Sequence, residues 1–160
     1  MKTILAPVDF SPITQAVVDN AALLARAVGG RVVILHVVDP AIVPGESSSM
    51  VVDLSRMQAR AEAGAAARLA ELAAGLRREG VEAEAAEVGG LATVQILEQA
   101  GARGADYIVM GSHGHGAVYD LLIGGTTHAI LKGARCPVVV VPAPRGDAGK
   151  AAERRSPEGR

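Results

Sequence analysis

A glycine-rich segment in the C-terminal half holds the residue types best suited to chemistry. Gly111, Gly114 and Gly124 follow the spacing G-x2-G-x9-G. Glycines permit positive φ and keep side chains away from backbone N–H groups, so an anion can approach those groups. A helix beginning near Thr126 would point its dipole at the same anion, and the hydroxyls of Thr126 and Thr127 would add donors. The spacing predicts a cradle for nucleotide phosphates; a surface loop between a strand and a helix is the plainer alternative.

Asp9 is a second candidate, because it directly follows the first apolar run of the chain, Ile4–Val8. At the end of a strand, its carboxylate can accept hydrogen bonds from ribose hydroxyls or from the adenine amino group. It can equally hold the turn into the next helix. The sequence leaves both interpretations open.

The histidines and the cysteine give weaker signals. His113 and His115 lie two residues apart in the glycine loop, but a tetrahedral metal site needs further ligands and none is obvious nearby. We expect them to donate to phosphate or to face solvent, and we expect no metal site. His36 falls in an apolar run, which indicates a satisfied core histidine, and we expect His128 on a helix surface. Cys136 has no base placed beside it, which favours a structural thiol.

Sequence signatures of catalysis are absent. There is no G-x-x-x-x-G-K-[ST] and no G-x-S-x-G, and the glycines do not follow G-x-G-x-x-G after the first strand. The spacing places no carboxylate pair and no Ser/His/Asp set. We therefore expect a protein that is not an enzyme, with at most a trace of ATPase activity.

Five strand patterns, of which Val81–Val88 alternates apolar and polar residues and is the weakest, alternate with helical patterns, and they must position these candidates. The strand patterns are Ile4–Val8, Arg31–Val38, Val81–Val88, Ala105–Met110 and Pro137–Val141. This alternation predicts a three-layer α/β/α fold with a five-stranded parallel sheet in the order 3-2-1-4-5. A ligand should then bind between strands one and four, over their carboxyl ends, where Asp9 and Gly111 stand.

Helical spacing predicts the connecting segments. The first expected helix runs from Ser11 to Val28, with Ser11 as N-cap and Pro12 at its first position, and a loop follows at Asp39–Met50. A long helix comes next and ends at Gly80; one of its faces carries Leu54, Met57, Ala61, Ala65, Leu69, Leu72 and Leu76. Two further helices are expected, one at Leu91–Arg103 with Val94 and Leu97 inward and one from about Thr126 to Lys132.

Composition excludes several classes of function. The formal net charge is −1, and only two Tyr and one Phe are present, so nothing favours nucleic acid or an anionic membrane. A single cysteine, no signal peptide and no apolar run of membrane-spanning length together predict a cytoplasmic protein. Residues 143–160 are polar and of mixed charge, which predicts a disordered tail.

Over residues 1–142 the chain resembles the universal stress protein family, in its ATP-binding branch. The resemblance is carried by Ala6-Pro7-Val8-Asp9-Phe10-Ser11, His36-Val37-Val38-Asp39, Met110-Gly111-Ser112-His113-Gly114, Gly124 at its spacing, and Cys136-Pro137-Val138-Val139-Val140-Val141. It implies an adenine nucleotide alpha hydrolase-like fold, ATP (or AMP or ADP) as ligand with Mg²⁺ reaching the site through the phosphates, and a homodimer formed through the last strand, Pro137–Val141.

The resemblance also assigns the site residues. Pro7 and Val37 would flank the adenine, and Asp9 would contact the adenosine. The ribose and phosphates would be wrapped by Gly111, Ser112, His113, Gly114, His115, Gly116 and Ala117, and the phosphates met by Gly124, Gly125, Thr126 and Thr127. The family places Ser or Thr where this chain has Gly125, so one hydroxyl donor is lost. We expect a regulatory nucleotide-binding module; a slow ATPase and a nucleotide-free dimeric scaffold are the alternatives.

Overall fold

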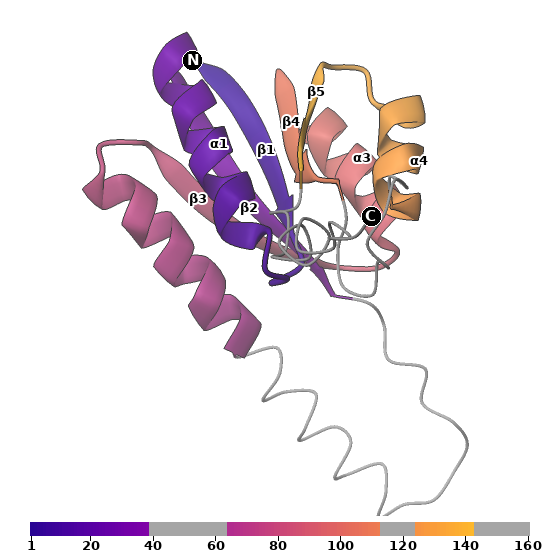
Figure 1. Ribbon diagram of the computed structural model, residues 1–160, viewed down its shortest axis with the longest axis horizontal. Helices are drawn as coiled ribbons and strands as arrows, with labels where there is room; N and C mark the ends of the chain where they lie inside the picture. Colours follow the sequence, from indigo (N-terminus) through magenta and orange to yellow (C-terminus); the bar gives the residue numbers. More distant parts are fainter. Residues whose placement is uncertain (39–63, 113–123, 143–160) are drawn as a thin grey trace, which may run out of the picture.

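A five-stranded parallel sheet forms the middle layer of the protein (Figure 1). The structure, a computed structural model, describes residues 1–38, 64–112 and 124–142. The strands are β1 (Lys2–Val8), β2 (Gly30–Val38), β3 (Ala83–Gly89), β4 (Tyr107–Gly111) and β5 (Val138–Val141). Their order is β3-β2-β1-β4-β5 and all adjacent pairs are parallel, which confirms the predicted topology.

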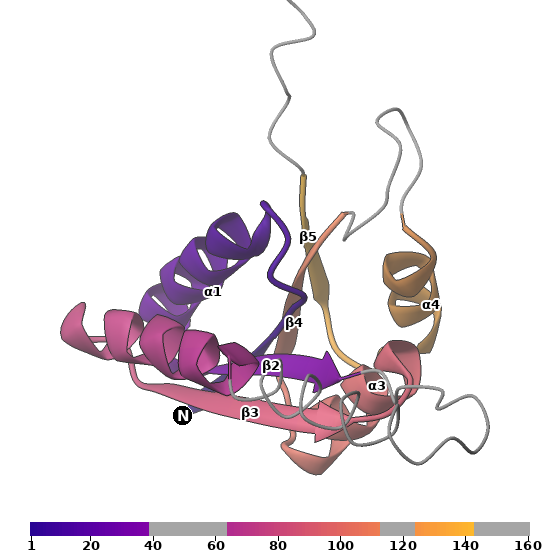
Figure 2. The same ribbon diagram turned by 90° about the horizontal axis from the view of Figure 1, so that it is seen from below.

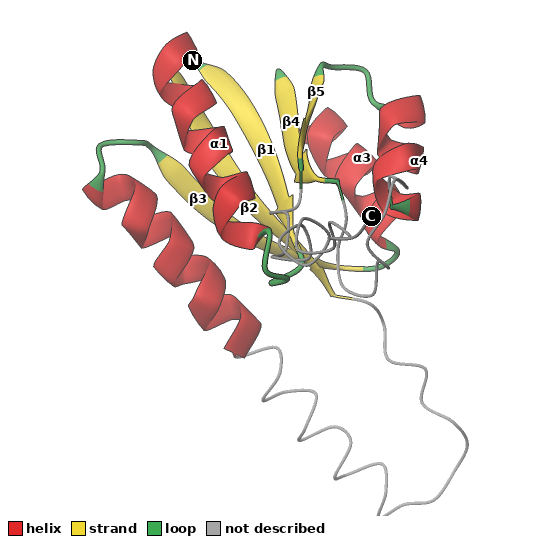
Figure 3. Cartoon of the chain, in the orientation of Figure 1, coloured by secondary structure: helices red, strands yellow, loops and turns green. Residues whose placement is uncertain are grey.

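Helices cover both faces of this sheet, so the three-layer prediction is confirmed (Figure 2). α1 (Thr14–Val28) and the helical segment 64–78 pack on one face. α3 (Ala92–Ala102) and α4 (Gly125–Gly133) pack on the other. Figure 3 shows the alternation of strands and helices along the chain. None of the helices within the described ranges is long and apolar enough to cross a membrane.

Alternate residues of each central strand enter two separate cores. Ile4 and Ala6 of β1 face α1, whereas Leu5 between them faces α3 and α4. Successive side chains of a strand point to opposite faces, and here both faces are covered. This explains why the central strands read as continuous apolar runs. Each fully buried large aliphatic side chain stabilises the fold by about 1.5–3 kcal/mol.

The start of α1 differs from the prediction. The helix begins at Thr14, with Ile13 as N-cap, and Ser11 makes no side-chain cap. The backbone instead forms a turn before the helix, in which Thr14 N donates to Ser11 O at 3.0 Å. This turn places the predicted N-cap and Pro12 ahead of the first helical residue. The other end is as predicted, because Gly29 takes a left-handed φ of 64° and its N–H donates to Ala25 O.

One core assignment in α3 was also wrong. Val94 was predicted to face inward, but it is 45% exposed. Ile96 is the buried residue at 3%, with Ala92 and Ala100 packed on the same side. These three residues are spaced by four, so they form the stripe that meets the sheet, and Val94 falls on the opposite side of the helix. Leu97 packs against this core as expected.

The helical segment 64–78 buries the predicted face as far as the structure describes it. Leu69, Ala73 and Leu76 are buried against α1, and Leu72 packs partly against the same core. Gly80 follows the helix with φ of 77°. The earlier part of the predicted helix, the predicted loop Asp39–Met50 and the predicted tail 143–160 lie outside the described residues.

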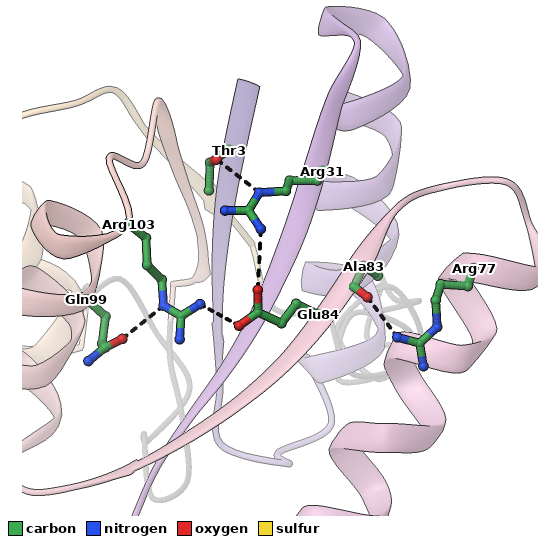
Figure 4. Close-up of polar contacts among 7 residues, drawn as sticks. All are labelled: Thr3, Arg31, Arg77, Ala83, Glu84, Gln99 and Arg103. Atoms are coloured by element: carbon green, nitrogen blue, oxygen red, sulfur yellow. Dashed lines mark hydrogen bonds and ion pairs between the residues drawn. The ribbon is translucent and has the colours of Figure 1, made fainter. Parts of the chain in front are cut away.

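Polar side chains tie together the edge of the sheet where the strands begin, here called the amino edge (Figure 4). Glu84 of β3 is bridged by two guanidinium groups, with Arg103 Nη1 at 2.6 Å and Arg31 Nη1 at 3.4 Å. Arg31 also donates to Thr3 Oγ1 of β1 at 3.3 Å, and Arg103 to Gln99 Oε1 of α3 at 2.9 Å. This edge is therefore cross-linked by side chains from three neighbouring strands and a helix.

Candidate functional site

The strands β1 and β4 separate at the opposite edge, where the strands end, here called the carboxyl edge. The ladder between β1 and β2 continues to Val8↔His36. The ladder between β1 and β4 instead ends at Leu5↔Ile108. β1 leads to α1 on one face, and α4 lies on the other, so the chain turns to opposite sides at this point. The predicted switch point is therefore present, and ligands of open α/β sheets bind at such points.

The N-terminus of α4 is held beside the end of β4. Gly124 N donates to Ser112 O at 2.9 Å, and Ser112 N donates to Val141 O of β5 at 2.8 Å. The buried Thr127, 3% exposed, donates its hydroxyl to Gly111 O at 2.9 Å. Two of these bonds fix the start of α4 beside the end of β4, and the third joins the end of β4 to β5. The Thr127 hydroxyl proton points at β4 here, so it would have to leave this bond to serve a phosphate.

The first turn of α4 has the features of an anion site. An α-helix leaves its first N–H groups without partners inside the helix, and here these include Gly125 and Thr126. The N-cap Gly124 makes no side-chain cap, and no acidic residue stands in the first turn. A Cβ built at Gly125 would meet nothing within 4 Å, and Gly125 and Thr126 are both exposed. None of the residues that the structure describes therefore blocks the approach of a ligand to this backbone.

The predicted adenosine side lies at the ends of β1 and β2. Pro7 and Val37 are partly exposed, and Val37 packs beside the core on the α3 and α4 face. Asp9 accepts a hydrogen bond from Ser11 N on Oδ1 at 3.1 Å. The turn-holding role that the sequence offered for Asp9 is thus present. A carboxylate accepts several hydrogen bonds, so the same residue remains a candidate for the ribose or adenine.

Phe10 and Arg68 were not singled out from the sequence. Phe10 follows Asp9 and has φ of 60°, which is unusual for a bulky residue. Its ring lies 4.5 Å from the His36 ring, and Arg68 Cζ lies 4.2 Å from the Phe10 centroid. These contacts join residues from three elements far apart in the chain. No spacing rule reveals such a contact, although an aromatic residue beside the candidate Asp9 was a hint.

The other reactive residue types serve the structure. His36 is partly buried, with Nδ1 at 2.9 Å from Val8 O, so it is satisfied as predicted. His128 is exposed on α4. Cys136 is a free, partly buried thiol packed beside the α3 and α4 core, and burial, followed by the charge of Asp106, raises its pKa. A high pKa keeps the thiol protonated and unreactive.

Part of the predicted glycine loop cannot be placed. His113, Gly114, His115, Gly116 and Ala117 lie outside the described residues. Within the described ranges, no three His, Cys, Asp or Glu side chains gather as a group that could hold a metal ion. The described part of the candidate site thus consists of the ends of β1, β2 and β4 and of the first turn of α4, which is bonded to the end of β4.

Fold and site define a doubly wound α/β protein with an anion-favouring helix N-terminus at its switch point. The model of the universal stress protein family matches residues 1–142, and the chain therefore belongs to this family. It is 32% identical to universal stress protein A homolog 1 of Coxiella burnetii over 142 residues, which is 88% of this chain and 95% of that protein.

Solved structures agree with this assignment. Protein MJ0577 of Methanocaldococcus jannaschii superposes with a TM-score of 0.76 at 26% identity, covering 91% of this chain and 98% of that chain. A universal stress protein of Archaeoglobus fulgidus, solved in complex with dAMP, has the same fold with a TM-score of 0.56 at 20% identity, covering 88% and 96% of the two chains.

Proposed function

We propose that the chain binds ATP, or another adenine nucleotide such as AMP or ADP, at the carboxyl edge as a regulatory module of a cytoplasmic stress response. The observation that carries this proposal is the first turn of α4, which has no side-chain cap from Gly124 and is fixed beside the point where β1 and β4 separate. Membership of the universal stress protein family supports it, as does the dAMP complex of the Archaeoglobus fulgidus protein.

The binding mode follows from the arrangement of the described residues. The phosphates would lie over the N–H groups of Gly125 and Thr126, where the positive end of the α4 dipole favours anions. The nucleoside would lie towards Pro7, Asp9 and Val37, at the ends of β1 and β2. This mode uses main-chain donors rather than a lysine, and Mg²⁺ would enter only with the phosphates. We therefore propose a binding protein with at most trace ATPase activity.

Gly125 is the departure from the family pattern, and the structure shows that it is not forced by sterics. A Cβ at this position has open space, so a serine fits. A hydrogen bond contributes about 0.5–1.5 kcal/mol, or about 1.5–3 kcal/mol to a charged group. At about 1.4 kcal/mol per tenfold, the missing hydroxyl lowers phosphate affinity by about 3- to 100-fold relative to a serine. The backbone donors remain, so binding persists.

A series at Gly125 tests the proposal by isothermal titration with ATP and with adenosine. Gly125→Ser should raise ATP affinity within the range above. Gly125→Asp should lower ATP affinity by tenfold or more, because a carboxylate would occupy the phosphate position. The same carboxylate stabilises the helix N-terminus by about 0.3–1 kcal/mol, so unfolding cannot explain the loss.

Gly125→Ala is the matched control, because it adds a Cβ without a hydroxyl or a charge. Adenosine affinity should stay the same throughout the series, since adenosine carries no phosphate. Absence of ATP binding to the wild-type chain at millimolar concentration, or equal ATP affinity in the Ala and Asp variants, would refute the proposed site.

We also propose that β5 forms the homodimer contact. β5 is an edge strand of four valines, and Val139 is 38% exposed. An apolar unpaired edge invites pairing with another strand, and a second copy would cover it. Val139→Lys should shift the chain to a monomer in sedimentation analysis; an unchanged sedimentation coefficient would contradict this contact.

A further inference from the structure

Phe10 has a backbone conformation that its own residue type disfavours. Its φ of 60° is the only positive φ of a non-glycine residue in residues 1–38, 64–112 and 124–142. An L-residue with a bulky side chain is strained in this region, because Cβ approaches the following carbonyl oxygen. Such a conformation persists only where surrounding contacts hold it, and such residues concentrate at ligand sites. Phe10 directly follows Asp9, the candidate nucleoside contact.

The ring of Phe10 supplies the contacts that hold this conformation. The His36 ring lies at 4.5 Å with an interplanar angle of 44°, and it is itself fixed by the 2.9 Å contact between Nδ1 and Val8 O. The guanidinium of Arg68 lies over the Phe10 ring at 4.2 Å. A cation over an aromatic face is attracted by the ring quadrupole. Phe10 is thus clamped between the end of β2 and the helical segment 64–78.

The strained turn determines where the Asp9 carboxylate lies. With Phe10 left-handed, Ser11 N comes to 3.1 Å from Asp9 Oδ1. If Phe10 relaxed to a negative φ, the turn geometry that brings Ser11 N to Asp9 Oδ1 would change and this hydrogen bond would weaken. The carboxylate would then lose one of its restraints at the carboxyl edge, and ordering it against a ligand would cost more conformational entropy.

We propose that Phe10 is a positioning residue for nucleoside recognition, acting through its clamp by His36 and Arg68 to preorganise Asp9. This inference rests on the proposed function and deepens it at the end of the site away from the phosphates. The ring does not touch the ligand in this account. The ring affects nucleoside affinity because a carboxylate that is already held in place does not have to be ordered on binding.

The test measures adenosine and ATP affinity by isothermal titration for variants of Phe10. Phe10→Leu keeps the bulk but removes the aromatic face, and Phe10→Ala removes the clamp. Both should lose about 5- to 30-fold in affinity, equally for adenosine and ATP, which is about 1–2 kcal/mol. Phe10→Tyr keeps the ring and should restore the affinity to within about threefold of wild type. The equal loss separates this effect from Gly125→Asp, which affects ATP alone.

A double-mutant cycle with Asp9→Asn gives the decisive readout. Asp9→Asn should weaken adenosine binding about tenfold in the wild-type background and less than about threefold in Phe10→Ala, because a mobile carboxylate contributes little. Arg68→Met is the substitute variant if Phe10→Ala does not fold. It keeps much of the side-chain length but removes the cation, so it should reproduce part of the affinity loss of Phe10→Leu.

The outcomes separate the two proposals. A wild-type chain that binds neither adenosine nor ATP overturns the proposed function and this inference together. If the wild-type chain binds adenosine, and Phe10→Leu and Arg68→Met bind it with the same affinity as wild type, the inference about Phe10 is overturned and the proposed function stands. Additive effects of Asp9→Asn and Phe10→Ala would also overturn it, because they would show that the ring does not act through the carboxylate.

Discussion

The two edges of the same sheet are built by different means. At the amino edge, side chains satisfy one another, as in the bridge from Arg31 through Glu84 to Arg103. At the carboxyl edge, two of the bonds that join β4, β5 and α4 link backbone atoms, Ser112 N to Val141 O and Gly124 N to Ser112 O, and one side-chain bond, from the Thr127 hydroxyl to Gly111 O, adds to them. Side-chain networks close a surface, whereas main-chain bonds between strand ends leave N–H groups of the next helix turn directed outward.

The glycines show the same contrast. A Cβ at Gly30, on the amino edge, would lie 2.7 Å from Lys2 O and 2.7 Å from Ile4 Cδ1. A Cβ at Gly125, on the carboxyl edge, would meet nothing within 4 Å. Glycine thus permits close packing at one edge and leaves open space at the other. The comparison assigns stability chiefly to the amino edge and ligand access to the carboxyl edge.

Gly30→Ala should produce the largest effect on stability. The added methyl collides with a backbone oxygen, which cannot rotate away as a side chain can, so β1 and β2 must move apart. Such overpacking costs about 1–3 kcal/mol, measurable as a lower midpoint in urea unfolding. Nucleotide affinity of the folded protein should not change.

Gly125→Ala is the matched control for this substitution. It adds the same methyl group in open space, and replacing glycine within a helix is favourable, so stability should rise by at most about 1 kcal/mol. Equal losses in the two variants would show that the contrast between the edges is wrong.

The fold was predictable because its signals are local and repeated. Continuous apolar runs such as Val32–Leu35 mark strands buried on both faces, and their alternation with helices restricts the topology. The errors concern the residue at which α1 begins and the side of α3 that faces the sheet. Ser11 has the residue type of an N-cap, but its carbonyl closes a turn with Thr14 before the helix starts. Val94 and Ile96 are both apolar, and only packing against the sheet shows which one is buried.

Thr127→Val should have a moderate effect, and at the carboxyl edge it should affect stability and binding together. The substitution preserves the shape but removes the bond from the Thr127 hydroxyl to Gly111 O. A lost buried hydrogen bond costs about 0.5–1.5 kcal/mol. Because this bond fixes the first turn of α4 beside β4, ATP affinity should fall as well. Thr127→Ser keeps the hydroxyl as the control; unchanged ATP affinity in both variants would separate this bond from the site.

The site was only partly predictable, for a related reason. The glycine spacing and Asp9 are local features, so the sequence places them at the carboxyl edge. The bond from Thr127 to Gly111 and the clamp on Phe10 join residues from separate elements. Such contacts depend on how helices lie on the sheet, which local periodicity does not determine. Thr127 was thus predicted as a phosphate donor, and its bond to the strand end became visible only in the structure.

The smallest expected effect concerns the pH dependence of the amino edge. Asp106 accepts hydrogen bonds from Lys2 Nζ and from Thr3 N, both at 2.8 Å. The hydrogen bond from Lys2 is the largest cause, followed by that from Thr3 N, and together they lower the pKa of Asp106 below its usual 3.8. Asp106 in turn raises the pKa of Lys2 above 10.5. The native state therefore favours the carboxylate and the ammonium more than the unfolded chain does. The contribution of the pair of Lys2 and Asp106 to stability is fully present at neutral pH, which lies between the usual pKa values of the two groups.

Lowering the pH through the depressed pKa of Asp106 protonates the carboxylate and removes this contribution, and raising the pH through the raised pKa of Lys2 removes it from the other side. Asp106→Asn should therefore lower the urea midpoint slightly at pH 7, and the gap to wild type should narrow as the pH falls below about 4. Lys2→Met should show a weaker form of the same behaviour, because the bond from Thr3 N remains.

Both variants should bind ATP like wild type, because Asp106 lies at the amino edge, away from the first turn of α4. A gap that stays constant from pH 7 to pH 3 would show that the charge of Asp106 does not stabilise this edge, and the amino edge would then depend on the close packing around Gly30 and on the bridge through Glu84 rather than on the pair of Lys2 and Asp106.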